Sequence, residues 1–185
     1  MLIDPETGET TRSVAFRGRA ELMVADPSGN RLYVSTSAPA RNDATPIVEL
    51  DATNGEILAR GWQCCADLNG PSGLSATADG VWVTAPTGMM ASLTFLREGD
   101  LHRAALFAPG GSKGLTAYVA RGLLWVVDLL GGYSCADAAT GKVIGHVGIK
   151  EAPTGVSNIV SVPSGLYVGA FDGLARMRPS PDCPV

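Results

Sequence analysis

A repeated pattern of glycine turns and short apolar strands constrains this chain more than any other feature. One set of glycines lies in the short polar segments ETGE, TNGE, REGD and ATGK, at Gly8, Gly55, Gly99 and Gly141. A second set precedes strands rich in aromatic and β-branched residues, at Gly29, Gly80, Gly122 and Gly165. Both sets recur about every 40 to 50 residues, a period typical of propellers and solenoids. Two independent markers with the same period predict a repeat protein.

Each repeat is predicted to hold four short strands separated by turns. The first strands are expected at 21–25, 73–77, 115–119 and 157–162, and the second at 32–36, 81–85, 123–128 and 166–170. The third are expected at 47–51, 92–96, 133–137 and near 174–177, and the fourth at 57–61, 101–108 and 143–149. The second strands are rich in Val, Leu, Tyr and Trp, as strands buried on both faces are.

These repeats predict an all-β fold, a β-propeller of about four four-stranded antiparallel blades, with residues 1–185 as a single domain. The chain starts in a third strand and ends after another third strand. Either the terminal strands complete one blade together and close a small ring, or the chain is a segment or half of a larger propeller. A half that a second copy completes would make the protein a homodimer.

The strand and hairpin sequences resemble those of bacterial propeller repeats. LYVSTS at 32–37, VWVTAP at 81–86 and LYVGAF at 166–171 resemble the motif of the YVTN-type repeats, which are WD40-like. The hairpins IDPETGET, LDATNGEIL and ADAATGKVI, at 3–10, 50–58 and 136–144, resemble those of YVTN-type and quinoprotein-like (PQQ-like) repeats. The resemblance implies a propeller and is unspecific for function.

One departure from the quinoprotein-like pattern concerns the cofactor. Such repeats place a Trp four residues after the hairpin glycine, where it docks between blades. The corresponding positions here hold Arg12, Ala59, Arg103 and Gly145. The third hairpin also has Phe95 where the others have Asp4, Asp51 and Asp137. These departures count against bound pyrroloquinoline quinone, and no cofactor is predicted.

The charge and the hydropathy of the chain argue against nucleic acid as a partner and against a membrane-spanning helix. The net charge of -4 and the pI near 5.1 come without a basic stripe to meet phosphates, so no nucleic acid is expected. No stretch approaches the roughly 20 apolar residues of a membrane helix, because Asp128 interrupts the apolar run at 123–130. The acidic start MLIDPETGET lacks the regions of a secretory signal, so the protein is expected to be cytoplasmic or to lack an upstream signal.

The cysteine count allows two disulfides in an oxidising compartment, with three connectivities among Cys64, Cys65, Cys135 and Cys183. A vicinal bond, a bond between distant cysteines and reduced buried thiols all stay open. Disulfides would place the protein outside the cytoplasm, secreted or periplasmic. No metal site is predicted, because the Cys pair lacks the usual two-residue gap and the histidines are distant.

Loops at one end of the ring form the predicted contact face. The long loop 38–46 carries Arg41, Asn42 and Asp43. The loop 62–71 carries Trp62, Gln63, Asp67 and Asn69, and another loop holds Lys113. A loop with Trp and mixed polar groups fits a ligand or partner contact. The alternative is an ordinary solvated loop with Trp62 packed between blades.

Other polar residues have structural interpretations. The innermost strands are expected to line the axis with Met23, Ser75, Thr116 and Ser157. Asp51 and Asp137 precede tight turns and are expected to cap the hairpin backbone. His102 and His146 are expected on outer strands that face solvent.

No Ser-His-Asp or paired-carboxylate arrangement can be assembled from these positions. The sequence therefore favours a non-enzymatic β-propeller, a scaffold or a module that binds an unknown protein or small-molecule ligand. The alternative is a propeller-based enzyme, either a quinoprotein-like oxidoreductase or a metal-dependent lyase. ADGVWVTAP at 78–86 resembles strands of the streptogramin lyases, which act with a divalent metal and a central His. Neither His102 nor His146 is expected near the axis.

Overall fold

The computed structural model describes residues 2–3, 6–15, 19–37, 46–62, 71–87, 90–107, 116–127, 133–147, 158–170, 173–177 and 183. In this part of the chain the regular elements are antiparallel strands, grouped into four blades and an N-terminal hairpin. No helix in the same residues is long and apolar enough to cross a membrane.

Each blade is built from strands that follow one another in the chain and in the sheet. The first blade contains β3 (Arg19–Ala25), β4 (Arg31–Ser37), β5 (Pro46–Asp51) and β6 (Ile57–Trp62). The second contains β7 (Gly73–Thr77), β8 (Gly80–Thr87), β9 (Met90–Arg97) and β10 (Arg103–Phe107). The third contains β11 (Thr116–Ala120), β12 (Leu123–Val127), β13 (Tyr133–Asp137) and β14 (Val143–Val147). The described part of the fourth contains β15 (Asn158–Val162), β16 (Gly165–Ala170) and β17 (Gly173–Arg176).

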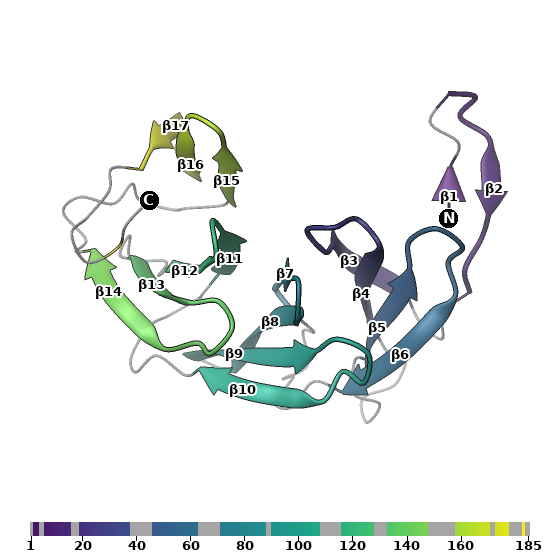
Figure 1. Ribbon diagram of the computed structural model, residues 1–185, viewed down its shortest axis with the longest axis horizontal. Coiled ribbons are helices and arrows are strands. Elements are labelled where there is room, and N and C mark those ends of the chain that lie inside the picture. The colour runs from purple at the N-terminus through teal and green to yellow at the C-terminus, as the bar shows by residue number, and fades with distance from the viewer. Residues whose placement is uncertain are drawn as a thin grey trace.

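The predicted fold class is confirmed, because four antiparallel sheets are arranged as a four-bladed β-propeller. In Figure 1 the blades follow one another along an arc, with β7 and β11 on its inner side and β10 and β14 on its outer side. The predicted strands agree with the observed ones to within a few residues. The strand ends shift by at most two residues, for example at β10, which begins at Arg103 and not at residue 101.

The ends of the chain do not complete one blade together in the described residues. The hairpin of β1 (Leu2–Ile3) and β2 (Thr10–Arg12) is a sheet of its own, and β17 pairs only with β16. Figure 1 shows the hairpin at one end of the arc and β15–β17 at the other. Within the described residues, the terminal strands therefore do not close a ring in the way considered from the sequence.

Apolar faces of neighbouring blades form the core. One cluster joins the first and second blades around Tyr33, Ile47 and Val83, and another joins the second and third around Trp82 and Leu124. A third cluster joins the third and fourth blades around Trp125 and Leu166. Burial of these side chains supplies the main stabilising free energy, at about 1.5 to 3 kcal/mol for each large side chain. The second strand β8, for example, is buried on both faces at Val81, Trp82 and Val83, as its sequence predicted.

The hairpin of the second blade corrects the repeat alignment. The amides of Gly55 and Gly141 donate to the carbonyls of Asp51 and Asp137, and both glycines have positive φ. In the second blade the amide of Leu101 makes this bond to Arg97, with φ of 49°. Leu101, and not Gly99, therefore occupies the hairpin glycine position. The docking-Trp position then falls on Ala105, and the position of Asp51 falls on Arg97 and not on Phe95.

Candidate functional site

Most of the predicted contact residues lie outside the described part of the chain. This holds for Arg41, Asn42, Asp43, Gln63, Cys64, Cys65, Asp67, Asn69 and Lys113. Trp62 is the last residue of β6. The predicted loop face therefore stays a prediction, and the site below is built from the strands.

The residues predicted to line the axis have different surroundings. Ser75 is buried, and its hydroxyl accepts a hydrogen bond from the amide of Val119 on β11. This bond joins the second blade to the third, so Ser75 links blades and does not line an open channel. Met23 on β3 is 68% exposed, on the face of the first blade that points away from the second. Thr116 begins β11, and Ser157 lies outside the described residues.

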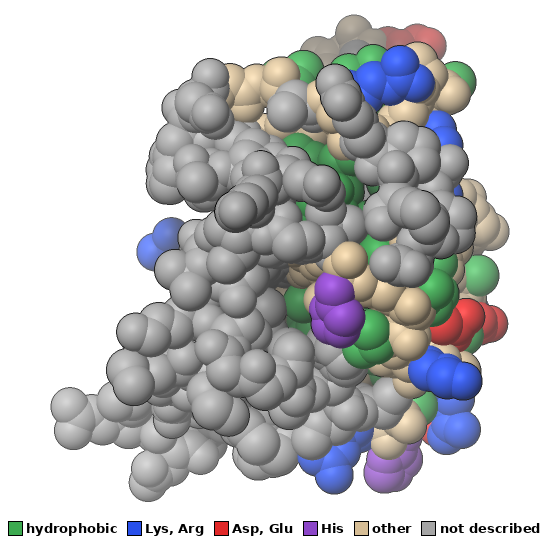
Figure 2. All heavy atoms as spheres, turned by 90° about the vertical axis from the view of Figure 1, so that its left-hand side faces the viewer, with side chains coloured by type: hydrophobic (Ala, Val, Ile, Leu, Met, Phe, Trp, Pro, Cys, Tyr) green, Lys and Arg blue, Asp and Glu red, His purple; other side chains and the backbone are tan. Residues whose placement is uncertain are grey.

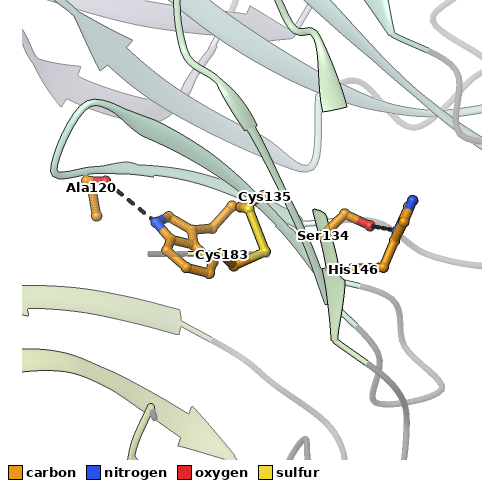
Figure 3. Close-up of a disulfide and its surroundings, with 6 residues drawn as sticks. Ala120, Ser134, Cys135, His146 and Cys183 are labelled. Atoms are coloured by element: carbon orange, nitrogen blue, oxygen red, sulfur yellow. Dashed lines mark hydrogen bonds between the residues drawn. A yellow bond between two sulfur atoms is a disulfide. The ribbon is translucent and has the colours of Figure 1, made fainter. Parts of the chain in front are cut away.

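A disulfide joins Cys135 on β13 to Cys183, with 5.7 Å between the Cα atoms. Both residues are buried in the cluster between the third and fourth blades. The indole N–H of Trp125 donates a hydrogen bond to the carbonyl of Ala120. Figure 3 shows this hydrogen bond and the disulfide beside the indole ring. The disulfide therefore ties the residues after the fourth blade to the middle of the third.

The histidines lie at the surface, as predicted. His102 and His146 are both exposed, and histidine side chains are visible at the surface in Figure 2. The Nδ1 atom of His146 lies 2.7 Å from the hydroxyl of its cross-strand neighbour Ser134, on the opposite side of β13 from the disulfide (Figure 3). Among the described residues, no group of three or more His, Cys, Asp or Glu side chains is placed to hold a metal ion.

The predicted roles of Asp51 and Asp137 are confirmed. The Asp51 carboxylate accepts hydrogen bonds from the amides of Thr53 and Asn54. The Asp137 carboxylate accepts them from the amides of Ala139 and Thr140 and from the Thr140 hydroxyl. These bonds lower the pKa of both carboxyl groups, so both side chains stay ionised and hold their hairpins.

A charged cluster lies between the first two blades. Glu49 is fully buried, and its Oε2 accepts a hydrogen bond of 2.8 Å from the amide of Gly99. The Arg31 guanidinium lies 3.6 Å from the other Glu49 oxygen and 3.2 Å from Glu98. Burial, and then the charge of Glu49, raise the pKa of Tyr33, so its hydroxyl stays protonated. The cluster fixes the hairpin of the second blade against the first and is structural.

A pocket of about 460 Å³ lies between the first blade and the N-terminal hairpin. Among the described residues its lining is apolar apart from Glu21, and Met23 and Ile3 are both more than half exposed. Leu32, Val34, Leu50 and Gly55 form the part of its wall that belongs to β4, β5 and the following hairpin. This volume is in the range of pockets that bind small ligands or side chains of a partner.

The described geometry is similar to that of solved propeller structures. BamB from Moraxella catarrhalis matches with a TM-score of 0.58 and 16% identity over 85% of this chain and 41% of that one. The glutaminyl cyclase of Myxococcus xanthus matches with a TM-score of 0.53 and 12% identity over 84% of this chain and 62% of that one. The computationally designed Ika4 protein matches with a TM-score of 0.59 and 14% identity over 92% of this chain and 100% of that one.

These matches show the β-propeller fold. The chain spans about two fifths of the BamB chain and about three fifths of the cyclase. No protein-family model matches the sequence, and no curated protein matches it either.

Sequence reasoning missed the pocket for a specific reason. Met23 was expected to line the axis on an innermost strand, and Leu32 and Val34 lie on a second strand that was expected to be buried on both faces. The repeat pattern describes what the blades share, and it does not distinguish the face of the first blade that carries Met23 from the corresponding faces of the other blades. The repeat alone did not indicate how much of that face the hairpin at 2–12 would cover.

Proposed function

We propose that this chain is a non-enzymatic β-propeller scaffold that binds a partner through the apolar pocket of its first blade. The observation that carries the proposal is the exposure of Met23 beside that pocket. Its counterparts in the third and fourth blades, Ala117 and Ile159, are 2% and 7% exposed, and its counterpart in the second blade, Leu74, is partly buried. An apolar position that is buried in other blades and open in this one supports a surface for binding.

The chemistry of the pocket defines what it binds. Of the ten lining residues that the structure describes, nine are apolar side chains or glycine, and Glu21 adds one carboxylate. Such a lining favours an aromatic or aliphatic group without negative charge, because an anion would meet the Glu21 carboxylate in a partly desolvated site. A protein segment with an exposed aromatic side chain meets this description.

The compartment is part of the proposal. The Cys135–Cys183 disulfide supports a location outside the cytoplasm, since thiols in the cytosol are kept reduced. To test this point, free thiols are alkylated when the cells are broken, and the alkyl groups on the purified protein are counted. Four free thiols would contradict it, whereas two or fewer would support it.

The pocket is tested with the neutral fluorescent probe N-phenyl-1-naphthylamine, added to dilute protein. Saturable fluorescence enhancement is expected, and Met23→Glu should weaken probe binding about tenfold or more by placing a charge beside the apolar wall. Ile144→Glu is the matched control, because Ile144 is an exposed strand residue of the third blade, at 49% exposure. Equal probe binding by all three proteins, or none, would contradict the proposed site.

A further inference from the structure

We infer that the partner of this pocket is a second copy of the chain, whose fourth blade packs on the first blade as successive blades pack within one chain. The inference rests on the proposed function, because it names the occupant of the same pocket. It is carried by residue equivalences that the strand pairing defines. The first blade presents the exposed Met23 beside the pocket, the fourth blade presents the exposed Leu174, and each of these two faces is the counterpart of a face that is buried elsewhere.

An aromatic residue stands at the centre of the second strand in every blade. These residues are Tyr33, Trp82, Trp125 and Tyr167, and they pair with Val24, Ser75, Tyr118 and Val160 of the first strands. The first three are fully buried against the following blade. Tyr167 is partly exposed, and its hydroxyl lies 3.4 Å from that of Ser164 within its own blade. The ring of Tyr167 therefore occupies a position that three other blades bury.

Leu174 on β17 is also exposed at a position that is buried in the other blades, and the difference in exposure is larger than for Tyr167. It pairs with Gly169, two residues beyond Tyr167, as Ile47, Leu93 and Tyr133 pair with residues two beyond the other aromatics. Those three counterparts are 0%, 0% and 8% exposed, whereas Leu174 is 74% exposed. Val160, the cross-strand neighbour of Tyr167, is 48% exposed. The fourth blade thus presents an apolar face that matches the buried faces of the other three.

The pocket is the counterpart of the surface that receives Trp82. Trp82 of the second blade packs in one cluster with Leu124, Val126 and Ala136 of the third blade, and its ring lies against Gly141 of that blade. The residues at the same positions of the first blade are Leu32, Val34, Leu50 and Gly55, all of which line the pocket. The first blade therefore carries the equivalent surface, and the pocket lies over it. Val34 and Leu50 are already 3% and 4% exposed, and Val14 packs against them, so an incoming ring must displace part of this cover.

The positions of the faces favour a second copy over closure within one chain. The N-terminal hairpin and β15–β17 lie at opposite ends of the arc in Figure 1. Two copies joined head to tail at both ends form a closed ring in which every blade face is covered. The hairpin β1–β2 must shift to admit β17. The free-energy cost of this shift is expected to be small, because a two-stranded sheet by itself is only marginally stable.

The decisive measurement is the mass of the full chain in solution, by sedimentation velocity over a concentration series without reductant. The wild-type protein is expected at twice the 19.1 kDa of one chain. Met23→Glu and Leu174→Glu should each raise the dissociation constant of the dimer at least a hundredfold, while Ile144→Glu leaves it unchanged. A non-reducing gel excludes a covalent dimer. A monomeric wild-type protein would overturn the inference.

Mixing the variants tests the head-to-tail geometry. Met23→Glu keeps an intact fourth-blade face, and Leu174→Glu keeps an intact first-blade pocket. An equimolar mixture should therefore form a heterodimer through one unaltered contact, whereas each variant alone stays monomeric. A mixture that remains monomeric, while the wild type is a dimer, would show that the two faces do not meet and would overturn the proposed contact.

The naphthylamine probe separates this inference from the proposed function. Probe binding should fall as the wild-type protein concentration rises, because the dimer fills the pocket, and should stay constant in Leu174→Glu. Constant binding in a monomeric wild type would retain the pocket and reject the second copy. Absence of binding in Leu174→Glu would reject the pocket itself.

Discussion

The indole ring of Trp82 lies against Gly141 of the following blade so closely that a Cβ atom at residue 141 would stand 2.8 Å from ring atom Cη2. The indole N–H donates a 2.7 Å hydrogen bond to the carbonyl of Ala138 in the same hairpin. One side chain therefore contacts the backbone of the next blade in two ways. The spacing between these blades depends on a glycine at that point.

Replacing Gly141 by alanine should destabilise the protein in two ways. The position has φ of 71°, which costs an alanine about 1 kcal/mol, and the added Cβ overlaps the Trp82 ring at about 1 to 3 kcal/mol more. Gly122→Ala in the same blade is the matched control, because Gly122 has φ of 75° and nothing within 4 Å of an added Cβ. Urea unfolding measures both. Equal losses would contradict the packing described.

Replacing Tyr33 by phenylalanine should leave stability unchanged or raise it by about 1 to 2 kcal/mol. The Tyr33 hydroxyl is buried without a hydrogen-bond partner in the described residues, and an unpaired buried hydroxyl costs free energy. Tyr167→Phe serves as the control, because that hydroxyl lies near the Ser164 hydroxyl at the surface. Urea unfolding that reports a loss above about 1 kcal/mol for Tyr33→Phe would indicate a hydrogen bond to this hydroxyl.

Breaking the Cys135–Cys183 disulfide should lower the midpoint of thermal unfolding. The two cysteines are 48 residues apart in the sequence, and closing a loop of this length is worth about 4 kcal/mol in the chain-entropy estimate. The double variant Cys135→Ala and Cys183→Ala should show a lower midpoint that no longer responds to reductant. Both proteins are compared in a Cys64→Ala and Cys65→Ala background. A midpoint unaffected by reductant in the parent would contradict the bond.

Acid should weaken the hairpins that Asp51 and Asp137 cap. Hydrogen bonds lower the pKa of both carboxyl groups in the folded state. The unfolded chain therefore takes up protons at a higher pH than the folded one. The stabilisation is complete above the ordinary pKa of 3.8 and is lost as the pH falls through the lowered folded value.

The measurement is the thermal midpoint of the wild type and of the Asp51→Asn, Asp137→Asn double variant as a function of pH. The wild type should melt a few degrees higher at neutral pH, and the gap should close below about pH 4. A gap that stays constant as the pH falls would show that ionisation of the two carboxyl groups does not stabilise the hairpins.

Local sequence was sufficient for the blade and its turns. The four second strands could be located because a run of apolar and aromatic residues and a preceding glycine are signals within a few residues of each other. The caps at Asp51 and Asp137 could be predicted because donor and acceptor lie within three residues. The hairpin at 97–101 was misaligned because Gly99 resembled the glycine of the other hairpins. Packing of Leu101 between blades instead holds Leu101 at positive φ.

The sequence by itself determined an all-β repeat with four strands in each blade, since turn chemistry and strand alternation are encoded by neighbouring residues. Only the tertiary structure decided which blade faces are covered. Tyr33, Trp82, Trp125 and Tyr167 stand in equivalent strands, yet three are buried and one is partly open. The cover comes from residues about 40 to 50 positions away, and the fourth blade has no such neighbour in the described chain. The pairing of Cys135 with Cys183 likewise depended on which blades lie side by side.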